Sequence, residues 1–208
     1  MTSSSGERQI GKRLDDIAPD HVARYHWAAR MLHIKLDRKV FGPPRILDAA
    51  CGCGYGSEVL AQSGFKVTGV DISPEAKAYA RHFGAGRDWD FLQHDILNLG
   101  HLGKFDAVVS IETVEHINQD GFWVTHMHRL ADLAVVTVPN QLVTPFTPNQ
   151  FKHHFRHYTP DQLGGLFRAR DWNIEENDWW TQKGTKWKGT DMSPGKGGRV
   201  LGIIASGA

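Results

Sequence analysis

The sequence predicts an α/β fold, in which a doubly wound and mostly parallel sheet carries helices on both faces. Two observations lead to this prediction. A strand, a turn with three glycines, an apolar-periodic helix and a second strand follow one another within residues 45–71. Strand-like and helix-like segments then alternate over most of the remaining chain, which is typical of a parallel sheet covered on both sides.

The first of these segments has the pattern of a nucleotide-binding unit. A buried strand at Ile46–Leu47 ends on Asp48, and the glycines that follow permit positive φ angles and close approach of the backbone to a ligand. The second strand, Lys66–Asp71, also ends on an acid. Its Asp71 follows Gly52 by 19 residues, where a carboxylate can accept hydrogen bonds from a ribose diol.

The remaining elements are assigned from apolar and β-branched runs. Five further strands are expected at Asp90–Gln93, Phe105–Ser110, Leu133–Val138, Trp172–Glu175 and Val200–Ile204. Helices are expected around Val59–Ala61 and at Pro74–Phe83, Val114–Ala131 and Pro160–Arg168. The last two strands have no obvious helix between them, so they should pair antiparallel at one edge of a seven-stranded, Rossmann-like sheet.

Length and composition limit the possibilities further. With 208 residues, 40% of them hydrophobic, the chain can form one globular domain, assigned to residues 19–208. Residues 1–18 are polar and should be loosely held, and they lack the apolar core of a signal peptide. No apolar run is long enough to span a membrane, and the net charge of +1 gives no general attraction for nucleic acid. Cys51 and Cys53 are interpreted as small packing residues in a reducing, cytoplasmic setting.

Asp48 helps to distinguish the possible nucleotide ligands. S-adenosylmethionine (SAM) has positive sulfonium and ammonium groups, which an acid at the strand end attracts. The same acid would repel the pyrophosphate of a dinucleotide. SAM is therefore the favoured ligand, and an NAD-dependent oxidoreductase is an alternative. For Asp48 itself, the alternative is a turn or helix-capping role.

Several longer motifs resemble those of class I SAM-dependent methyltransferases, over about residues 20–204. They are His21–Ala28, Leu47–Ser57, Glu112–His116, Val138–Asn140 and His154–Leu163. Val138 departs from the family pattern, which has threonine at this place. The similarity is greatest to a branch that contains O-methyltransferases of glycan-synthesis loci and of the ubiquinone pathway, together with small-RNA 2′-O-methyltransferases.

This resemblance implies a set of cofactor-binding residues. The full set is Tyr25, Asp48, Ala50, Gly52, Gly54, Asp71, Ile72, His94, Asp95, Ile96, Ser110 and Ile111. Within it, Asp48 and Gly52 should lie under the methionine part of SAM, and Asp71 should bind the ribose. Asp95 should accept the adenine amino group, with a loop cap as the alternative. The alternative for Tyr25 is a helix-packing aromatic.

Glu112, Glu115 and His116 form a second candidate group. If this segment is helical, their i, i+3, i+4 spacing puts them on one face at the carboxyl end of a strand. Carboxylate and imidazole ligands suit a divalent cation, and Mg²⁺ or Mn²⁺ is expected. The relatives imply His154 as a fourth ligand, and Glu112, His116 and His154 are the candidate catalytic residues. A general base without metal, or acids that only stabilise a helix start, are the alternatives.

The candidate residues favour methyl transfer to oxygen, because an alcohol needs activation by a metal ion or a base and an amine does not. A sugar or another small hydroxylated molecule is the expected acceptor. Tryptophans and lysines between Trp179 and Arg199 should form part of a lid. RNA 2′-O-methylation is one alternative, which this segment favours and the net charge of +1 does not. SAM binding without catalysis is another, and the oligomeric state is not predicted.

Overall fold

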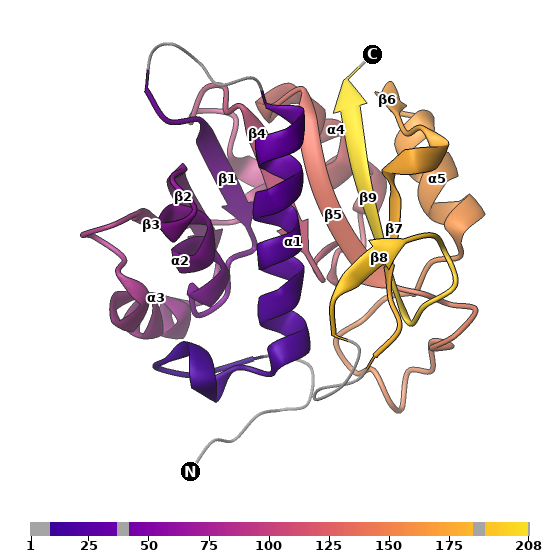
Figure 1. Ribbon diagram of the computed structural model, residues 1–208, viewed down its shortest axis with the longest axis horizontal. Coiled ribbons are helices and arrows are strands. Elements are labelled where there is room, and N and C mark those ends of the chain that lie inside the picture. The colour runs from indigo at the N-terminus through magenta and orange to yellow at the C-terminus, as the bar shows by residue number, and fades with distance from the viewer. Residues whose placement is uncertain (1–8, 37–41, 185–189, 208) are drawn as a thin grey trace.

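The computed structural model describes residues 9–36, 42–184 and 190–207, which form a nine-stranded sheet with helices on both faces (Figure 1). The strands are β1 (Arg45–Ala49), β2 (Lys66–Asp71), β3 (Asp90–Gln93), β4 (Ala107–Ile111), β5 (Leu133–Pro139), β6 (Trp172–Asn173), β7 (Trp179–Gln182), β8 (Met192–Pro194) and β9 (Val200–Gly207). The α-helices are α1 (Pro19–Lys35), α2 (Tyr55–Gln62), α3 (Pro74–Ala80), α4 (Asp120–Leu130) and α5 (Pro160–Arg168). Short 3₁₀ helices are η1 (Leu14–Asp16), η2 (Arg81–Phe83), η3 (Ile96–Asn98), η4 (Val114–His116) and η5 (Glu176–Asp178).

The strand order is β3-β2-β1-β4-β5-β9-β7-β8, and β6 pairs with β9 off this path. Strands β1 to β5 pair in parallel, whereas β9 runs antiparallel to both β5 and β7. The predicted α/β class and the antiparallel last strand are therefore confirmed. The order reverses between β1 and β4, where an open α/β sheet has a crevice at the carboxyl ends of its strands.

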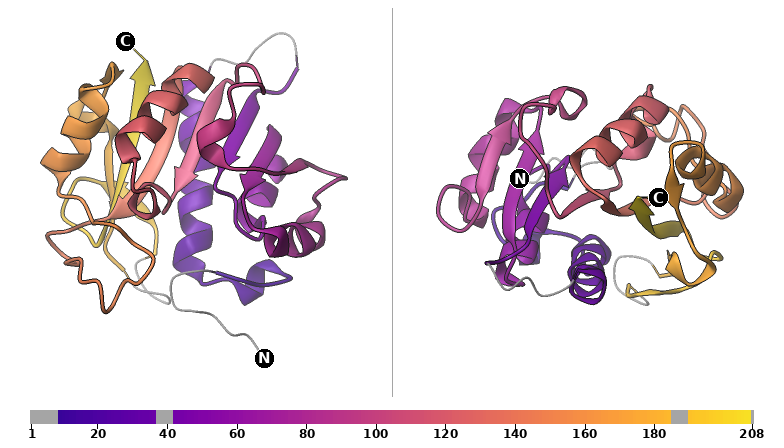
Figure 2. Two further views of the ribbon diagram at one scale, coloured as in Figure 1. Left: turned by 180° about the vertical axis from the view of Figure 1, so that it is seen from behind. Right: turned by 90° about the horizontal axis from the view of Figure 1, so that it is seen from above.

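Helices cover the two faces of the sheet in separate groups. Helices α1, α2 and α3 lie on one face, and α4 and α5 lie on the other (Figures 1 and 2). Each group encloses its own apolar core cluster, one around Trp27 and Leu60 and the other around Trp123 and Phe167. All seven residues of β5 are buried, because this central strand is covered on both sides.

The sheet has two more strands than predicted. The expected strand Trp172–Glu175 is reduced to the two residues of β6, and the main partner of β9 on that side is β7. The segment of β7 was expected to belong to a lid, yet Trp179 is only 3% exposed and belongs to the core. The pairing with β9 decides this, because it directs alternate residues of β7 inward. Trp187, also assigned to the lid, lies outside the described residues.

The predicted helix Val114–Ala131 is interrupted. It consists of η4 and α4, separated by residues 117–119, and the backbone of Ile117 is extended with φ −106° and ψ 116°. The expectation of a loosely held N-terminus also needs correction for residues 9–18. Ile17 is 3% exposed in the core beside α1, and Gln9 accepts a hydrogen bond from the Ala18 amide.

Candidate functional site

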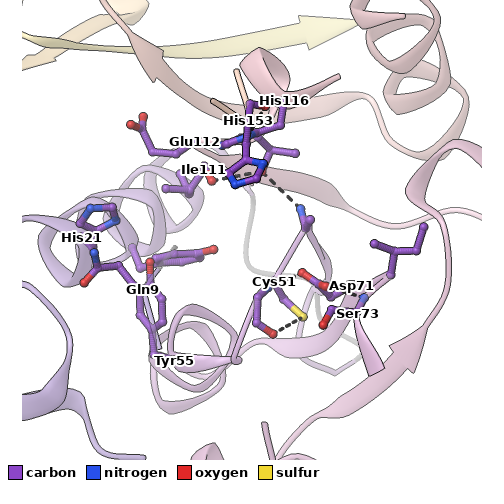
Figure 3. A pocket seen from close by; sticks show the side chains of 15 residues that line it. Gln9, His21, Cys51, Tyr55, Asp71, Ser73, Ile111, Glu112, His116 and His153 are labelled. Atoms are coloured by element: carbon purple, nitrogen blue, oxygen red, sulfur yellow. Dashed lines mark hydrogen bonds between the residues drawn. The ribbon is translucent and has the colours of Figure 1, made fainter. Parts of the chain in front are cut away.

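A cavity of about 480 Å³ lies at the carboxyl ends of β1, β2 and β4. Its walls come from the N-terminal segment, α1, the glycine turn and the residues that follow β4 (Figure 3). The lining residues are Gln9, His21, Tyr25, Ala50, Cys51, Gly52, Tyr55, Asp71, Ile72, Ser73, Ile111, Glu112, Thr113, His116 and His153. Six of the predicted cofactor-binding residues are among them, namely Tyr25, Ala50, Gly52, Asp71, Ile72 and Ile111.

Two glycines of the turn, Gly52 and Gly54, have different roles. Gly52 has φ 55° and lines the cavity, and a Cβ on it would meet no atom within 4 Å. Gly54 has φ 90°, but a Cβ there would lie 2.6 Å from the Trp89 ring. Gly54 does not line the cavity, so it permits close packing against Trp89 rather than the expected approach to a ligand.

Asp71 is held in place by the backbone. One carboxylate oxygen accepts a hydrogen bond from the Gly52 amide at 2.9 Å, and the other accepts one from the Ser73 amide at 2.9 Å. A carboxylate oxygen can accept more than one hydrogen bond, as binding of two ribose hydroxyls requires. Ile72 stands beside it with 68% of its surface exposed, where it offers an apolar face to a flat ring.

Asp48 lies beneath the cavity wall and not in it. The carboxylate is fully buried, and it accepts hydrogen bonds from the Tyr25 hydroxyl at 3.0 Å and the Ser57 hydroxyl at 2.6 Å. Burial raises the pKa of Asp48 to about 7 although both hydroxyls act in the opposite direction. Asp48 therefore acts on the cavity through Tyr25, whose ring lines it.

The other predicted cofactor-binding residues do not line the cavity. They are His94, Asp95, Ile96 and Ser110. Asp95 caps η3 by accepting a hydrogen bond from the Leu97 amide, which is the alternative role considered for it. Ser110 is fully buried and accepts a hydrogen bond from the Trp123 indole at 3.4 Å. Alternation along β4 turns Ser110 towards the core and leaves Ile111 at the cavity.

A second cavity of about 420 Å³ adjoins the first, since both are lined by Gln9, His21, Glu112 and His116. It extends towards the segment after β5 and the start of β9. The residues that line only this cavity are Asp20, Arg24, Glu115, Pro139, Thr144, Phe151, His154, Arg199 and Val200. Sequence motifs had not indicated Gln9 or Asp20, because neither lies at a strand end.

All four predicted metal ligands line the second cavity, but only three of them cluster. One ligand atom each of Glu115, His116 and His154 lies within 4.8 Å of the others. Glu115 is fully buried, and neither of its carboxylate oxygens has a hydrogen-bond partner among the described residues. Burial, together with the nearby Glu112, raises the pKa of Glu115 well above its usual value. A buried carboxylate with two unused oxygens beside two imidazoles fits a divalent cation.

Hydrogen bonds determine which nitrogen His154 presents to this cluster. Nδ1 of His157 lies 2.6 Å from the Thr144 carbonyl and must donate to it. Burial lowers the pKa of His157, so the ring is neutral and its Nε2 accepts a hydrogen bond from Nδ1 of His154 at 2.8 Å. Nε2 of His154 therefore keeps its lone pair for the cavity. Burial and the neighbouring histidines lower the pKa of His154 to about 3, which preserves this form at neutral pH.

Glu112 does not join the predicted cluster. Its backbone has φ 49°, and the segment continues as a 3₁₀ turn, so the i, i+3, i+4 spacing does not create one shared face. One carboxylate oxygen accepts a hydrogen bond from the Thr137 hydroxyl at 2.9 Å. The other lies 3.5 Å from a guanidinium nitrogen of Arg24. Glu112 instead forms part of the wall shared by the two cavities.

Comparison with known proteins agrees with this geometry. Residues 46–132 match a family model described as a methyltransferase domain. The ubiquinone biosynthesis O-methyltransferase of Burkholderia cenocepacia is 26% identical over 152 residues, which cover 64% of this chain and 66% of that protein, just under two thirds of its length. Magnesium protoporphyrin IX methyltransferase from Synechocystis PCC 6803, solved with bound SAM, superposes with a TM-score of 0.65 at 19% identity, covering 91% of this chain and 80% of that one.

A third similar protein is the 1,6-didemethyltoxoflavin-N1-methyltransferase of Burkholderia thailandensis, solved with its substrate and S-adenosylhomocysteine. It superposes with a TM-score of 0.63 at 20% identity, covering 89% of this chain and 79% of that one. The sheet and its cavity define a nucleotide-binding α/β protein. These matches and the fold support a class I SAM-dependent methyltransferase, and the methyltransferase-domain match itself covers residues 46–132. Among the described residues, no helix has both the length and the apolar character needed to cross a membrane.

Proposed function

We propose that this enzyme transfers the methyl group of SAM to a hydroxyl oxygen of a small acceptor, of which a sugar is one class, with the help of a divalent cation. The observation that carries the proposal is Glu115, a buried carboxylate with two unpartnered oxygens beside His116 and His154. These residues lie in the second cavity, which is the acceptor cavity in this proposal. It adjoins the first cavity, the cofactor pocket, so an acceptor oxygen can be activated beside the methyl donor.

The two cavities have different tasks in this proposal. Asp71 and the exposed Ile72 bind the nucleoside part of SAM, which supplies an electrophilic methyl group when bound. Tyr25, held by Asp48, forms a rigid wall beside it. Fixing donor and acceptor in line can contribute roughly 7–11 kcal/mol to lowering the barrier.

The hydrogen bond from Nδ1 of His154 to His157 fixes the ring so that the lone pair of Nε2 is available to bind the cation. Glu115, His116 and His154 would hold the cation. Such an ion lowers the pKa of a coordinated hydroxyl. Without Glu112 the donor set is one carboxylate and two imidazoles, which suits Mn²⁺ better than Mg²⁺.

The small-RNA alternative has less support than the sequence suggested. Trp179, which was expected to belong to the lid, is buried in the core, and Lys196 lies 4.9 Å from its ring and also pairs with Glu176. Trp179 is therefore not available to stack on a base. A small acceptor that fits a cavity of about 420 Å³ is the better match.

The test follows S-adenosylhomocysteine release with candidate sugars, nucleotides and quinols. We expect chelator to abolish turnover without weakening S-adenosylhomocysteine binding, and added Mn²⁺ to restore it. Glu115→Gln removes the charged ligand, so it should lower turnover to the level seen in chelator. The matched control is Glu75→Gln, the same change on an exposed residue of α3. Full activity in chelator together with an active Glu115→Gln would exclude the metal.

A further inference from the structure

Asp20, near the start of α1, is a buried acid in the acceptor cavity whose two oxygens differ in their partners. It is 2% exposed. One oxygen, Oδ2, pairs with Nη2 of Arg24 at 3.4 Å and also with Nη2 of Arg199. The other, Oδ1, has no hydrogen-bond partner among the described residues.

An unpartnered carboxylate oxygen in this position is unfavourable, because it has lost its water and gained nothing in exchange. Buried polar atoms are satisfied in nearly all folded proteins, so an exception beside a cavity indicates a bond that a ligand completes. Asp20 and the cluster of Glu115, His116 and His154 line the same cavity. A ligand in that cavity therefore has two separate polar groups to satisfy.

The surrounding charges restrict the chemistry of that ligand. Arg24 is 2% exposed and Arg199 is partly buried, and both guanidinium groups already face the carboxylate of Asp20. An ammonium group at Oδ1 would be a third cation around one carboxylate, since Arg24 and Arg199 already pair with Asp20. A carboxylate or phosphate at the same place would be repelled by the negative charge of the Asp20 carboxylate. The group that suits both constraints is a neutral donor, and the smallest one is a hydroxyl.

We infer that Asp20 is an acceptor-binding residue that accepts a hydrogen bond from a second hydroxyl of the acceptor, so that the substrate is a diol or polyol and not a simple alcohol. This inference rests on the proposed O-methylation for the identity of the cavity. The reacting hydroxyl lies at Glu115, His116 and His154, and the second hydroxyl lies at Asp20. Asp20 thereby selects the acceptor and its orientation.

The variant Asp20→Asn tests this assignment directly. The two arginines are donors only, so the amide oxygen of the new side chain faces them and its NH₂ group takes the place of Oδ1. An acceptor of hydrogen bonds becomes a donor at that point. Asp15→Asn makes the same chemical change on an exposed residue of η1 and serves as the control.

The measurement is binding of three probes to the protein saturated with S-adenosylhomocysteine, by NMR titration. The probes are cis-1,2-cyclohexanediol, cyclohexanol and 2-aminocyclohexanol. In the wild-type and Asp15→Asn proteins, we expect the diol to bind roughly tenfold to a hundredfold more tightly than either analogue. In Asp20→Asn the preference for the diol should fall to about threefold or less.

Two results would overturn the inference: failure of the wild-type protein to prefer the diol, or an unchanged preference in Asp20→Asn. If Asp20→Asn does not fold, Asp20→Glu keeps the charge and displaces the oxygen by one methylene, and it should also reduce the preference. Because binding is measured without turnover, the outcome is separate from that of the proposed function. Loss of all methyl transfer with an intact diol preference would reject O-methylation and leave Asp20 as a binding residue.

Discussion

The cofactor pocket and the acceptor cavity share a wall but are assembled differently. In the cofactor pocket, both oxygens of Asp71 accept hydrogen bonds from nearby backbone amides before any ligand arrives. In the acceptor cavity, Glu115 has no partner for either oxygen and Asp20 has none for Oδ1, among the described residues. The first site is already satisfied by the fold, whereas the second keeps unsatisfied groups that only a cation or an acceptor completes.

The largest effect on ligand binding is expected at the cofactor pocket. Asp71→Ala removes the acceptor for the ribose hydroxyls and also frees the Gly52 and Ser73 amides. S-adenosylhomocysteine should bind about 1–3 kcal/mol more weakly, which is roughly 5–150-fold in affinity. Calorimetry measures this loss, with Asp95→Ala as a control that should bind nearly normally because Asp95 caps η3. An equal loss of affinity in both variants would contradict the assignment of Asp71 to the ribose and of Asp95 to a helix cap.

The next effect concerns the acceptor cavity alone. His157→Ala removes the ring that fixes the tautomer of His154, so activity should fall about tenfold to a hundredfold. S-adenosylhomocysteine affinity should stay unchanged, since His157 does not line the cofactor pocket. Steady-state kinetics measures the loss of activity, and calorimetry measures the affinity for S-adenosylhomocysteine. Normal turnover in this variant would show that the His154–His157 hydrogen bond is dispensable.

The two glycines of the turn should respond in opposite ways. Gly54→Ala puts a methyl group into the Trp89 ring at a positive φ, so the free energy of unfolding should fall by about 1–3 kcal/mol with cofactor affinity little changed in the folded protein. Gly52→Ala meets open space at the cavity, so it should cost about 1 kcal/mol of stability and weaken S-adenosylhomocysteine binding. Chemical denaturation and calorimetry on both variants test the contrast. Similar effects of the two changes would refute it.

A further effect is a dependence of stability on pH. The pKa of Asp48 is raised to about 7 in the folded protein, so the folded state binds more protons than the unfolded state between about pH 4 and 7. The contribution of Asp48 to stability is thus complete below pH 4 and is lost as the pH rises towards 7. Asp48→Asn should remove this loss, with a slope difference of at most about 1.4 kcal/mol per pH unit.

Unfolding of the cofactor-free protein by denaturant, repeated from pH 4 to 7, gives the two curves for Asp48→Asn and the wild type. They should diverge as the pH rises. Asp95→Asn provides the control, because it is the same substitution at a partly exposed acid. Parallel curves for Asp48→Asn and the wild type would show that Asp48 titrates alike in the folded and unfolded states.

The parts of the molecule that follow from local patterns were predictable. Helix α5 has the predicted bounds Pro160–Arg168, because Thr159 and Gln162 form a capping box and Pro160 begins the helix. The glycine turn and Asp71 were recognised because they belong to one short βαβ unit. Such features depend on residues close together in the sequence, where spacing alone fixes geometry.

The acceptor cavity depends on contacts that the sequence does not encode locally. Asp20 pairs with Arg199, which lies 179 residues later, and His154 meets His116 only because the segment after β5 folds back over η4. Glu112 was assigned to the metal on a helical spacing, but its positive φ and its contact with Arg24 turn it away. Spacing fixes which side chains share a face only where the backbone is regular. Across turns and between distant segments, packing decides which groups meet and which polar atoms remain for a ligand.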